Sequence, residues 1–305
     1  PTPTATPAPS PTTASASPTR TPTATTTSKT TATSKPTATS RTTTSRTTTT
    51  TSRPTTTKTT TTTTTKPTTT TTKPTTTTTK PSTTTSTCPL PSGVLGRDVE
   101  TLGTTKKVVA LTFDAGSSDA GVARILATLS GTGTPASFFL TGDFAQDYPA
   151  SAARIAASHP IGNHSMTHPE FTTLSDAQIV TELSRARTAI IAATGDDPKP
   201  WFRFPFGDVN ARVIATVNRQ CYVPFRWSVD SLGWQGTSGG QSVAAVTSRV
   251  VDGVQPGGIV LMHVGANPDD GTVLDADALP GIISGLRARG YTFTTLDAVV
   301  SSTLG

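Results

Sequence analysis

The first 87 residues lack the side chains from which a hydrophobic core is built. They use only Pro, Thr, Ala, Ser, Lys and Arg, and contain no Val, Ile, Leu or Phe. Nothing in this segment can offset the conformational entropy lost on folding. A heptad "KPTTTTT" recurs approximately, which is typical of an extended, O-glycosylated spacer. We therefore expect residues 1–87 to be a disordered Thr/Pro/Ser-rich stalk and residues 88–305 to form one folded domain.

The positive charge of the chain belongs to this stalk. Of the 25 Lys and Arg residues, ten lie in residues 1–87, which contain no acid, and 15 remain to set against 19 acidic residues. The folded part is therefore mildly acidic. The stalk is either a solvated spacer or a segment that associates with an anionic cell wall. Because it has no aromatic side chains and no dense basic cluster, we expect no nucleic-acid partner.

The same features predict a compartment. No run of 18 apolar residues is present, so we expect no transmembrane segment. A Ser/Thr/Pro-rich stalk favours a secreted or cell-wall associated protein, and the start at Pro1 indicates a removed N-terminus. We expect a monomer. The two cysteines, Cys88 and Cys221, either form a disulfide that ties the start of the domain to its body or remain free thiols.

Residues 88–305 alternate between two hydrophobic periodicities. Apolar runs predict strands at 106–114, 136–141, 201–204, 222–229, 258–263 and 291–295. Helical spacing predicts helices at 119–129, 150–157, 174–194, 209–218, 243–251 and 278–289. Alternation of this kind indicates an α/β fold with a parallel sheet. About seven β/α units favour a barrel over an open sheet, although the pattern does not decide closure.

Reactive side chains gather at or just after the ends of the predicted strands. They are Asp114, His164, His168, Arg203, Asp230 and His263. In parallel α/β folds the carboxyl edge of the sheet is where sites are built. On a helical turn His164 and His168 would share a face and could bind a metal, although such a pair by itself is a weak signal and could be two satisfied surface histidines.

The remaining motifs also allow two interpretations each. Arg203 could hold a carboxylate in a bidentate pair or form a surface salt bridge. Trp227 and Trp234 flank Asp230 and could stack on a sugar ring or belong to the core. His263 ends an apolar strand, which is a natural position for a general acid or base.

In their order and spacing, these stretches resemble the NodB-type polysaccharide deacetylases of carbohydrate esterase family 4, which include chitin and peptidoglycan deacetylases. The resemblance spans roughly residues 105–300. It rests on T-F-D at 112–114, H-S-x-x-H at 164–168, R-x-P-F-G at 203–207, S-x-D-x-x-x-W at 228–234 and L-x-H at 261–263. It implies a distorted, partly open (β/α) barrel.

The resemblance also implies a role for each matching residue. Asp114 corresponds to the general base and Arg203 to the residue that orients it. His164 and His168 correspond to ligands of a divalent metal, with Zn²⁺ expected. The acid is His263, oriented by Asp230. The backbone N–H of Phe206 would hold the oxyanion, and Trp234 would contact the substrate.

Ala115 departs from the family pattern. Most relatives carry there a second aspartate, the third protein ligand of the metal, and many carry an acid where this chain has Gly233. Three outcomes are open: weaker binding through two histidines, replacement by an oxygen from Asp119 or residues 267–277, or loss of the metal and of most activity.

The resulting expectation is metal-dependent hydrolysis of N-acetyl groups on a cell-wall polysaccharide, with peptidoglycan amino sugars as the leading substrate. Chitin and acetylxylan are alternative substrates. A metal-free wall-binding module that has lost catalysis is the alternative from another functional class.

Overall fold

The computed structural model describes Cys88 and residues 90–300, except for the side chain of Val300. The predicted stalk at residues 1–87 lies outside the described residues. The strands are β1 (Val108–Ala115), β2 (Ser137–Leu140), β3 (Ile161–Asn163), β4 (Trp201–Phe202), β5 (Val223–Pro224), β6 (Val229–Asp230), β7 (Ile259–His263) and β8 (Thr292–Thr294). The α-helices are α1 (Val122–Thr132), α2 (Gly142–Asp147), α3 (Pro149–Ala156), α4 (Asp176–Thr194), α5 (Ala211–Arg219), α6 (Val243–Gly253), α7 (Leu274–Ala288) and α8 (Asp297–Val300). Four 3₁₀ turns are η1 (Ser92–Val94), η2 (Phe171–Thr173), η3 (Pro205–Gly207) and η4 (Gly233–Gln235).

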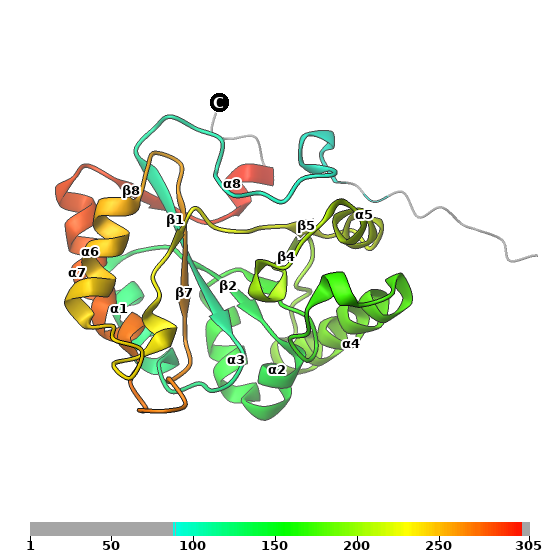
Figure 1. Cartoon of the computed structure of the whole chain (residues 1–305), viewed down its shortest axis with the longest axis horizontal. Coiled ribbons are helices and arrows are strands. Elements are labelled where there is room, and N and C mark those ends of the chain that lie inside the picture. Colours follow the sequence, from blue (N-terminus) through cyan, green and yellow to red (C-terminus); the bar gives the residue numbers. More distant parts are fainter. Residues whose placement is uncertain (1–87, 89, 301–305) are drawn as a thin grey trace, which may run out of the picture. The chain divides into compact units, whose positions relative to one another are not determined.

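The strands form one parallel sheet in the order β5-β4-β3-β2-β1-β7-β6, and β8 pairs with the amino end of β1. Figure 1 shows β1 and β7 at the centre, α6 and α7 on one flank, and α2, α3 and α4 on the other. Helices thus cover the outer face of the sheet, as a parallel sheet requires. The expected α/β fold is confirmed.

The two edge strands show that the sheet is curved into a barrel. β5 and β6 lie at opposite ends of the strand order, yet only residues 225–228 connect them. In a flat sheet six strand spacings would separate these edges by about 29 Å. Five Cα–Cα steps reach at most about 19 Å. The sheet must therefore curl round, which agrees with the expected distorted, partly open barrel.

The connector between the edges also continues the hydrogen bonding around the barrel. The amide of Phe225 donates to Phe202 of β4, and the amide of Ser228 donates to Ile259 of β7. The sequence pattern predicted a single strand at 222–229. The structure corrects this, because the chain leaves one edge after Pro224 and reaches the other edge at Val229.

Strand β1 presents a different surface on each side. Val109, Leu111, Phe113 and Ala115 belong to the main core cluster, which the sheet shares with α1, α3, α6 and α7. On the alternate face, Val108 and Ala110 belong to a second cluster with residues of β2, β4, β5 and β7. The same face continues as Thr112 and Asp114, because side chains alternate along a strand. The barrel interior is thus apolar at its amino end and polar at its carboxyl edge.

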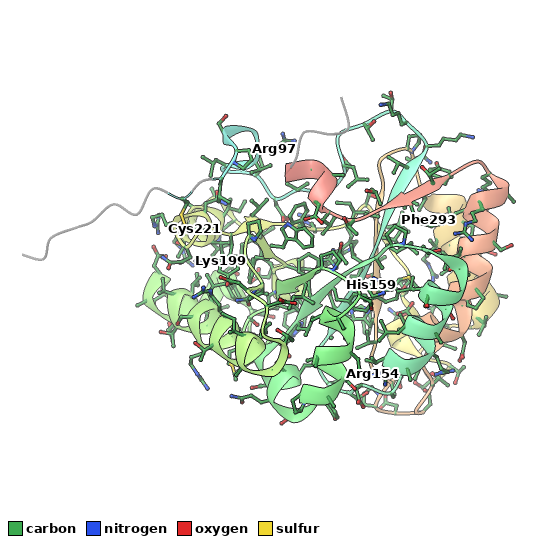
Figure 2. The ribbon with its side chains drawn as sticks, turned by 180° about the vertical axis from the view of Figure 1, so that it is seen from behind. Arg97, Arg154, His159, Lys199, Cys221 and Phe293 are labelled. Atoms are coloured by element: carbon green, nitrogen blue, oxygen red, sulfur yellow. A yellow bond between two sulfur atoms is a disulfide. The ribbon has the colours of Figure 1, made fainter. Side chains whose placement is uncertain are left out.

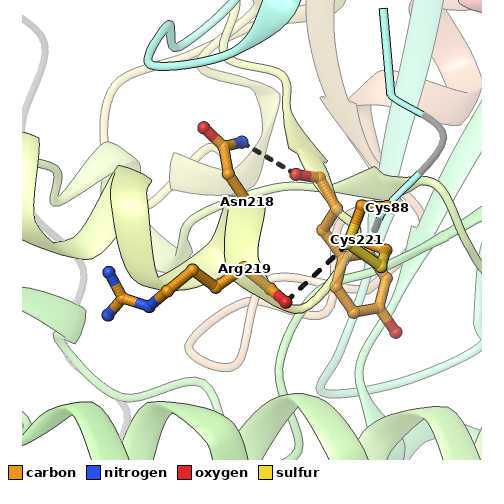
Figure 3. The surroundings of a disulfide bond; sticks show 5 residues. Cys88, Asn218, Arg219 and Cys221 are labelled. Atoms are coloured by element: carbon orange, nitrogen blue, oxygen red, sulfur yellow. Dashed lines mark hydrogen bonds between the residues drawn. A yellow bond between two sulfur atoms is a disulfide. The ribbon is translucent and has the colours of Figure 1, made fainter. Parts of the chain in front are cut away.

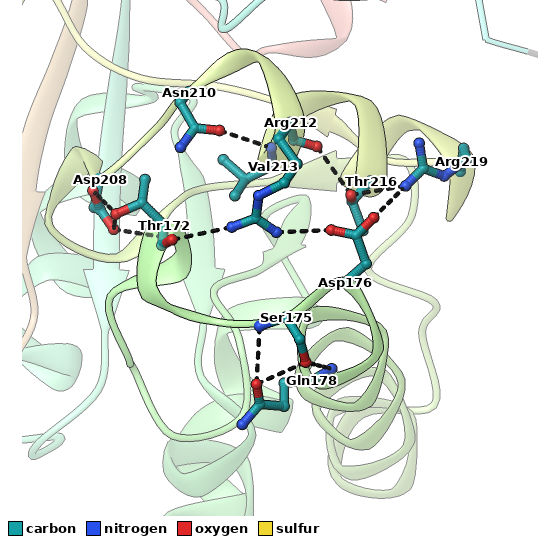
Figure 4. A network of polar contacts seen from close by, with 10 residues as sticks. All are labelled: Thr172, Ser175, Asp176, Gln178, Asp208, Asn210, Arg212, Val213, Thr216 and Arg219. Carbon is teal, nitrogen blue, oxygen red and sulfur yellow. Dashed lines mark hydrogen bonds and ion pairs between the residues drawn. The ribbon is translucent and has the colours of Figure 1, made fainter.

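A polar network joins α4 to α5 on the surface (Figure 4). The side chains of Ser175 and Gln178 form a capping box at the start of α4. Asp176, in the first turn of α4, accepts hydrogen bonds from Arg212 and Arg219 of α5. These exposed pairs hold two helices whose buried faces share a third apolar cluster around Phe202. They contribute little energy individually and mainly fix orientation.

Most predicted helices are present with shifted ends, and two differences matter for the site. The sequence placed residues 267–277 in a loop, whereas α7 begins at Leu274. It also missed α2, whose N-cap Thr141 accepts a hydrogen bond from the amide of Phe144. Among the described helices, none has both the length and the apolar character needed to cross a membrane.

Cys88 and Cys221 form a disulfide, which decides between the two alternatives left open by the sequence. The bond links the start of the described domain to Cys221, the second residue after the end of α5 (Figure 3). Figure 2, drawn from the reverse side, shows Cys221 beside the end of that helix. The cross-link spans a sequence separation of 133 residues.

Replacing both cysteines, as Cys88→Ser/Cys221→Ser, should lower the free energy of unfolding by about 2–4 kcal/mol, because a long loop is no longer closed in the unfolded chain. Urea denaturation measures the change. Reductant should destabilise the wild type by a similar amount and leave the double variant unaffected. Equal stability of the two proteins would show that the cross-link is energetically neutral.

Candidate active site

Asp114 lies near the carboxyl end of β1, on the polar part of the barrel interior. It is 6% exposed, and its Oδ1 accepts a hydrogen bond of 2.7 Å from Nη1 of Arg203. Burial would raise the pKa of Asp114, but the positive charge of Arg203, aided by His164 and His263, outweighs burial and lowers it. The carboxyl is therefore ionised at neutral pH, the form in which it can accept a proton.

Arg203 follows β4 and is completely buried. Besides Asp114, its guanidinium donates to Oγ1 of Thr112 at 2.9 Å and to the carbonyls of Phe225 and Arg226 at 3.2 Å each. The ring of Phe139 lies 4.2 Å from its central carbon. The structure therefore excludes the surface salt bridge, since Arg203 spans the barrel interior from β1 to the connector between the edge strands.

His164 directly follows β3, and its ring is oriented by a hydrogen bond at Nδ1. Nδ1 lies 2.9 Å from the carbonyl oxygen of Arg203, and Nε2 lies 3.4 Å from Oδ2 of Asp114. A carbonyl oxygen can only accept, so Nδ1 carries the proton of a neutral ring and Nε2 keeps its lone pair. Burial lowers the pKa of His164 more than Asp114 raises it, so the neutral form prevails.

His168 reaches the same place from a tight loop. The sequence pattern suggested a helical turn, but residues 164–168 are not helical, and Ser165 and His168 have φ values of 69° and 60°. The loop is held by Glu182 of α4, which accepts hydrogen bonds from the amides of Met166 and Thr167. The two imidazole rings are 4.8 Å apart. Burial, with the neighbouring His164, lowers the pKa of His168 to about 4.

The two histidines fit one part of a metal site. A neutral imidazole whose Nδ1 is fixed by a carbonyl is the arrangement that metal-binding histidines adopt. A catalytic zinc, however, takes three protein ligands. Within residues 88 and 90–300, no group of three or more His, Cys, Asp or Glu side chains is arranged to hold a metal. The described residues therefore provide two nitrogen donors and no third ligand.

Two of the candidates for a replacement oxygen, Asp119 and Asp270, have other partners. Asp119 accepts a hydrogen bond of 2.6 Å from Ser151 of α3. In the 267–277 segment, Asp270 accepts from Thr237, Ser238 and Thr272. Ala115 itself is fully buried in the main core cluster, on the face of β1 opposite to Asp114.

His263 ends β7 and is the register partner of Asp114 on β1. Its side chain is 29% exposed, and its amide donates to Oδ2 of Asp275 at 2.8 Å. Burial lowers the pKa of His263, but the carboxylates of Asp275, Asp114 and Asp230 outweigh burial and raise it. The ring therefore holds its proton to higher pH than an ordinary histidine, as a proton donor requires.

Two exposed aromatic side chains lie beside these groups. Phe206, 65% exposed, packs its ring 4.5 Å from that of His168, and Trp234, 48% exposed, lies 6.5 Å from the ring of His263. Trp227, in contrast, packs against the second core cluster and faces Arg203. Of the two tryptophans, Trp234 is therefore the one available to a ligand.

The chain was compared with known proteins. A model of the family described as polysaccharide deacetylase matches residues 101–224. The chain is 30% identical over 208 residues to a chitooligosaccharide deacetylase of Sinorhizobium fredii, covering 66% of this chain and 95% of that protein. The chain belongs to the polysaccharide deacetylase family. The resemblance found in the sequence is thereby confirmed, and so is the expectation that the chain is an enzyme of this family.

Other proteins similar to this chain include both a deacetylase and a pseudoenzyme. The peptidoglycan-N-acetylmuramic acid deacetylase PdaA of Bacillus subtilis is 32% identical, covering 66% of this chain and 74% of that protein. The structure of PdaA, a family 4 carbohydrate esterase, aligns with a TM-score of 0.63 at 28% identity, covering 68% of this chain and 86% of that one. A mutant of a CE4 family pseudoenzyme of Bacillus anthracis aligns with a TM-score of 0.61 at 28% identity, covering 67% and 71%.

The structure brings together most of the residues that the sequence singled out. Asp114 pairs with both Arg203 and His164, the ring of His168 lies against that of His164, and His263 lies on the adjacent strand. Asp230 lies on β6, and its Oδ1 accepts a hydrogen bond from the amide of Leu232. Sequence reasoning missed Asp275 as a neighbour of His263. Its position in the first turn of α7 was hidden because that turn was read as loop.

Proposed function

We propose that this polysaccharide deacetylase hydrolyses N-acetyl groups of a cell-wall glycan, with peptidoglycan amino sugars as the leading substrate. The observation that carries the proposal is the pairing of Asp114 and His263 as register partners at the carboxyl ends of β1 and β7. One is a buried carboxylate anchored by Arg203, and the other is a partly exposed imidazole. A base and an acid on adjacent strands suit the two proton transfers of amide hydrolysis.

Each residue has one task in the proposed reaction. Asp114 accepts a proton from the water whose oxygen attacks the acetyl carbonyl carbon. His263 donates a proton to the amide nitrogen as the C–N bond breaks, so that acetate and a free amine leave. Arg203 holds Asp114 in place and ionised. The backbone N–H of Phe206 supports the developing oxyanion, and Trp234 offers a face for a sugar ring. Asp230 adds negative charge near His263.

A divalent cation, expected to be Zn²⁺, would be held by His164 and His168. The chemistry it supplies is Lewis-acid polarisation of the acyl carbonyl. The relatives support the substrate class, since they include deacetylases of peptidoglycan and of chitooligosaccharides. Chitin and acetylxylan remain the alternative substrates. We further propose a secreted or wall-associated monomer, with residues 1–87 as the stalk.

A second candidate function is a glycan-binding module without catalysis. Two observations favour it: Ala115 in place of a ligand, and a structural relative that is a pseudoenzyme. The exposed rings of Phe206 and Trp234 would serve binding as well as catalysis. Activity and metal binding distinguish the two functions.

Acetate release should be measured with peptidoglycan, chitooligosaccharides and acetylxylan as substrates. Asp114→Asn should lower the rate by about 10²–10⁴-fold, the usual contribution of general acid–base help. The variant should still fold, at reduced stability, because Arg203 loses its paired charge but keeps Thr112 and two carbonyls as acceptors. Asp252→Asn, on the surface of α6, is the matched control. Glycan binding without acetate release from any substrate would favour the binding module.

Metal affinity should depend on His164 and should increase when a carboxylate is restored. We expect weak binding by the wild type, none by His164→Ala, and binding about 10- to 100-fold tighter by Ala115→Asp. Ala115 is the last residue of β1 and faces the core, so an aspartate at this position must turn out of the core to reach the metal. Ala115→Asp should therefore melt at a lower temperature without metal and recover when Zn²⁺ is added.

The measurement is a calorimetric titration with Zn²⁺, and His159→Ala controls for the loss of a histidine outside the site. Equal affinity of the wild type and Ala115→Asp would show that another residue completes the site. No binding by either protein would refute metal-dependent catalysis and leave the binding module.

A further inference from the structure

Two buried polar atoms at the active site lack partners, and they belong to two neighbouring side chains. Within the described residues, buried side-chain atoms without a hydrogen bond include Nδ1 of His263 and Oδ1 of Asp275. Nδ1 lies 3.8 Å from the other oxygen of the same carboxylate. A buried polar atom without a hydrogen-bond partner is destabilising. A small rotation of either side chain would bring Nδ1 of His263 within hydrogen-bond distance of the Asp275 carboxylate.

Asp275 is already fixed to the end of β7. It is 2% exposed, and its Oδ2 accepts the amide proton of His263 itself. The carboxylate is therefore attached to the backbone of the residue whose ring it approaches. Since Nδ1 is buried, the exposed surface of the His263 ring lies on its remaining atoms, which are free to face a substrate.

Gly233, in η4, leaves the space that this carboxylate occupies. A Cβ atom at position 233 would overlap all three carboxyl atoms of Asp275. The φ angle of Gly233 is not in the left-handed region, so its backbone does not require glycine. The absence of a side chain at 233 is thus explained by the presence of the Asp275 carboxylate.

Asp230 is placed less favourably for this task. Its Oδ1 accepts from the amide of Leu232 two residues along its own loop, and no hydrogen bond or ion pair joins it to His263 among the described contacts. It influences His263 through its charge alone, as Asp114 does from β1.

We infer that Asp275 of α7 is the positioning residue of the proton donor: its carboxylate accepts the Nδ1 proton of His263, fixes the ring, and stabilises the imidazolium, in the space vacated by Gly233. The inference rests on the proposed role of His263 as general acid. It assigns to Asp275 the task that the sequence motif assigned to Asp230. The arrangement is the carboxylate–imidazole pairing that orients catalytic histidines elsewhere, built here from a helix terminus.

The test is the titration of the four histidine rings by NMR in Asp275→Asn and in Gly233→Ala, with the full chain free of metal. Both substitutions should lower the pKa of His263, because each removes or displaces a negative charge beside Nδ1. Asp230→Asn should lower it less. The signal of His159, which precedes β3 at the amino edge of the sheet, should not move.

Kinetics provide the second readout. Asp275→Asn should lower kcat about 10- to 100-fold, the usual effect of removing a carboxylate that orients an imidazole, with KM nearly unchanged. Because less His263 is protonated at a given pH, the basic limb of the rate profile should move to lower pH. The double variant Gly233→Asp/Asp275→Ala places a carboxylate near Nδ1 from η4 instead of α7. It should recover part of the lost kcat and part of the shift in the pH profile. Asp277→Asn is the matched control, because Asp277 lies two residues after Asp275 on α7 and pairs with Arg124 instead of His263.

An unchanged titration of His263 in Asp275→Asn would overturn the inference, as would a larger shift in Asp230→Asn. If Asp275→Asn does not fold, Gly233→Ala alone decides, since it keeps the acid and only displaces it. The titration needs no substrate. Absence of deacetylation by the wild type would therefore count against the proposed function, while the histidine titration would still decide the role of Asp275.

Discussion

The buried ion pair between Arg203 and Asp114 connects the closure of the barrel to the candidate active site. The guanidinium of Arg203 bonds to Asp114 and Thr112 on β1, and to two backbone carbonyls of the segment between the two edge strands. A fully buried guanidinium is tolerated only when its charge and its N–H groups are satisfied. The curled sheet supplies these partners, because only curvature brings the connector near β1. The pair in turn keeps Asp114 ionised inside the protein.

Side chains alternate between the two faces of β1, which explains how the site can lack a metal ligand at residue 115 and still keep Asp114. Thr112 and Asp114 face the barrel interior, whereas Phe113 and Ala115 face the helices. Substitution at 115 therefore changes the surface that packs on the core and leaves Asp114 undisturbed. The proposed acid–base pair on β1 and β7 and the two imidazoles can therefore change independently of each other. A family that includes both deacetylases and pseudoenzymes is consistent with this separation.

The site residues could be predicted from sequence because parallel strands gather their carboxyl ends at one edge. Asp114, Arg203 and His263 each lie at the end of a predicted apolar run, which was enough to place them together. His164 follows β3, a three-residue strand that the hydrophobic pattern did not predict. What could not be predicted depends on contacts that periodicity does not encode. The run at 222–229 is mostly apolar and aromatic, and only the curvature of the sheet divides it between two edges. Asp275 reaches His263 because α7 begins early and η4 has a glycine.

The double-mutant cycle between Arg203 and Asp114 tests the central claim most directly. Urea denaturation of Arg203→Met, Asp114→Asn and the double variant gives the coupling energy, with the exposed Arg212→Met as the control for loss of a surface charge. Arg203→Met alone should cost about 3–5 kcal/mol, because it leaves a buried carboxylate unpaired. The double variant should be more stable than Arg203→Met, since that stranded charge is removed. Strictly additive effects, or a loss for Arg203→Met no larger than that of Arg212→Met, would contradict the account.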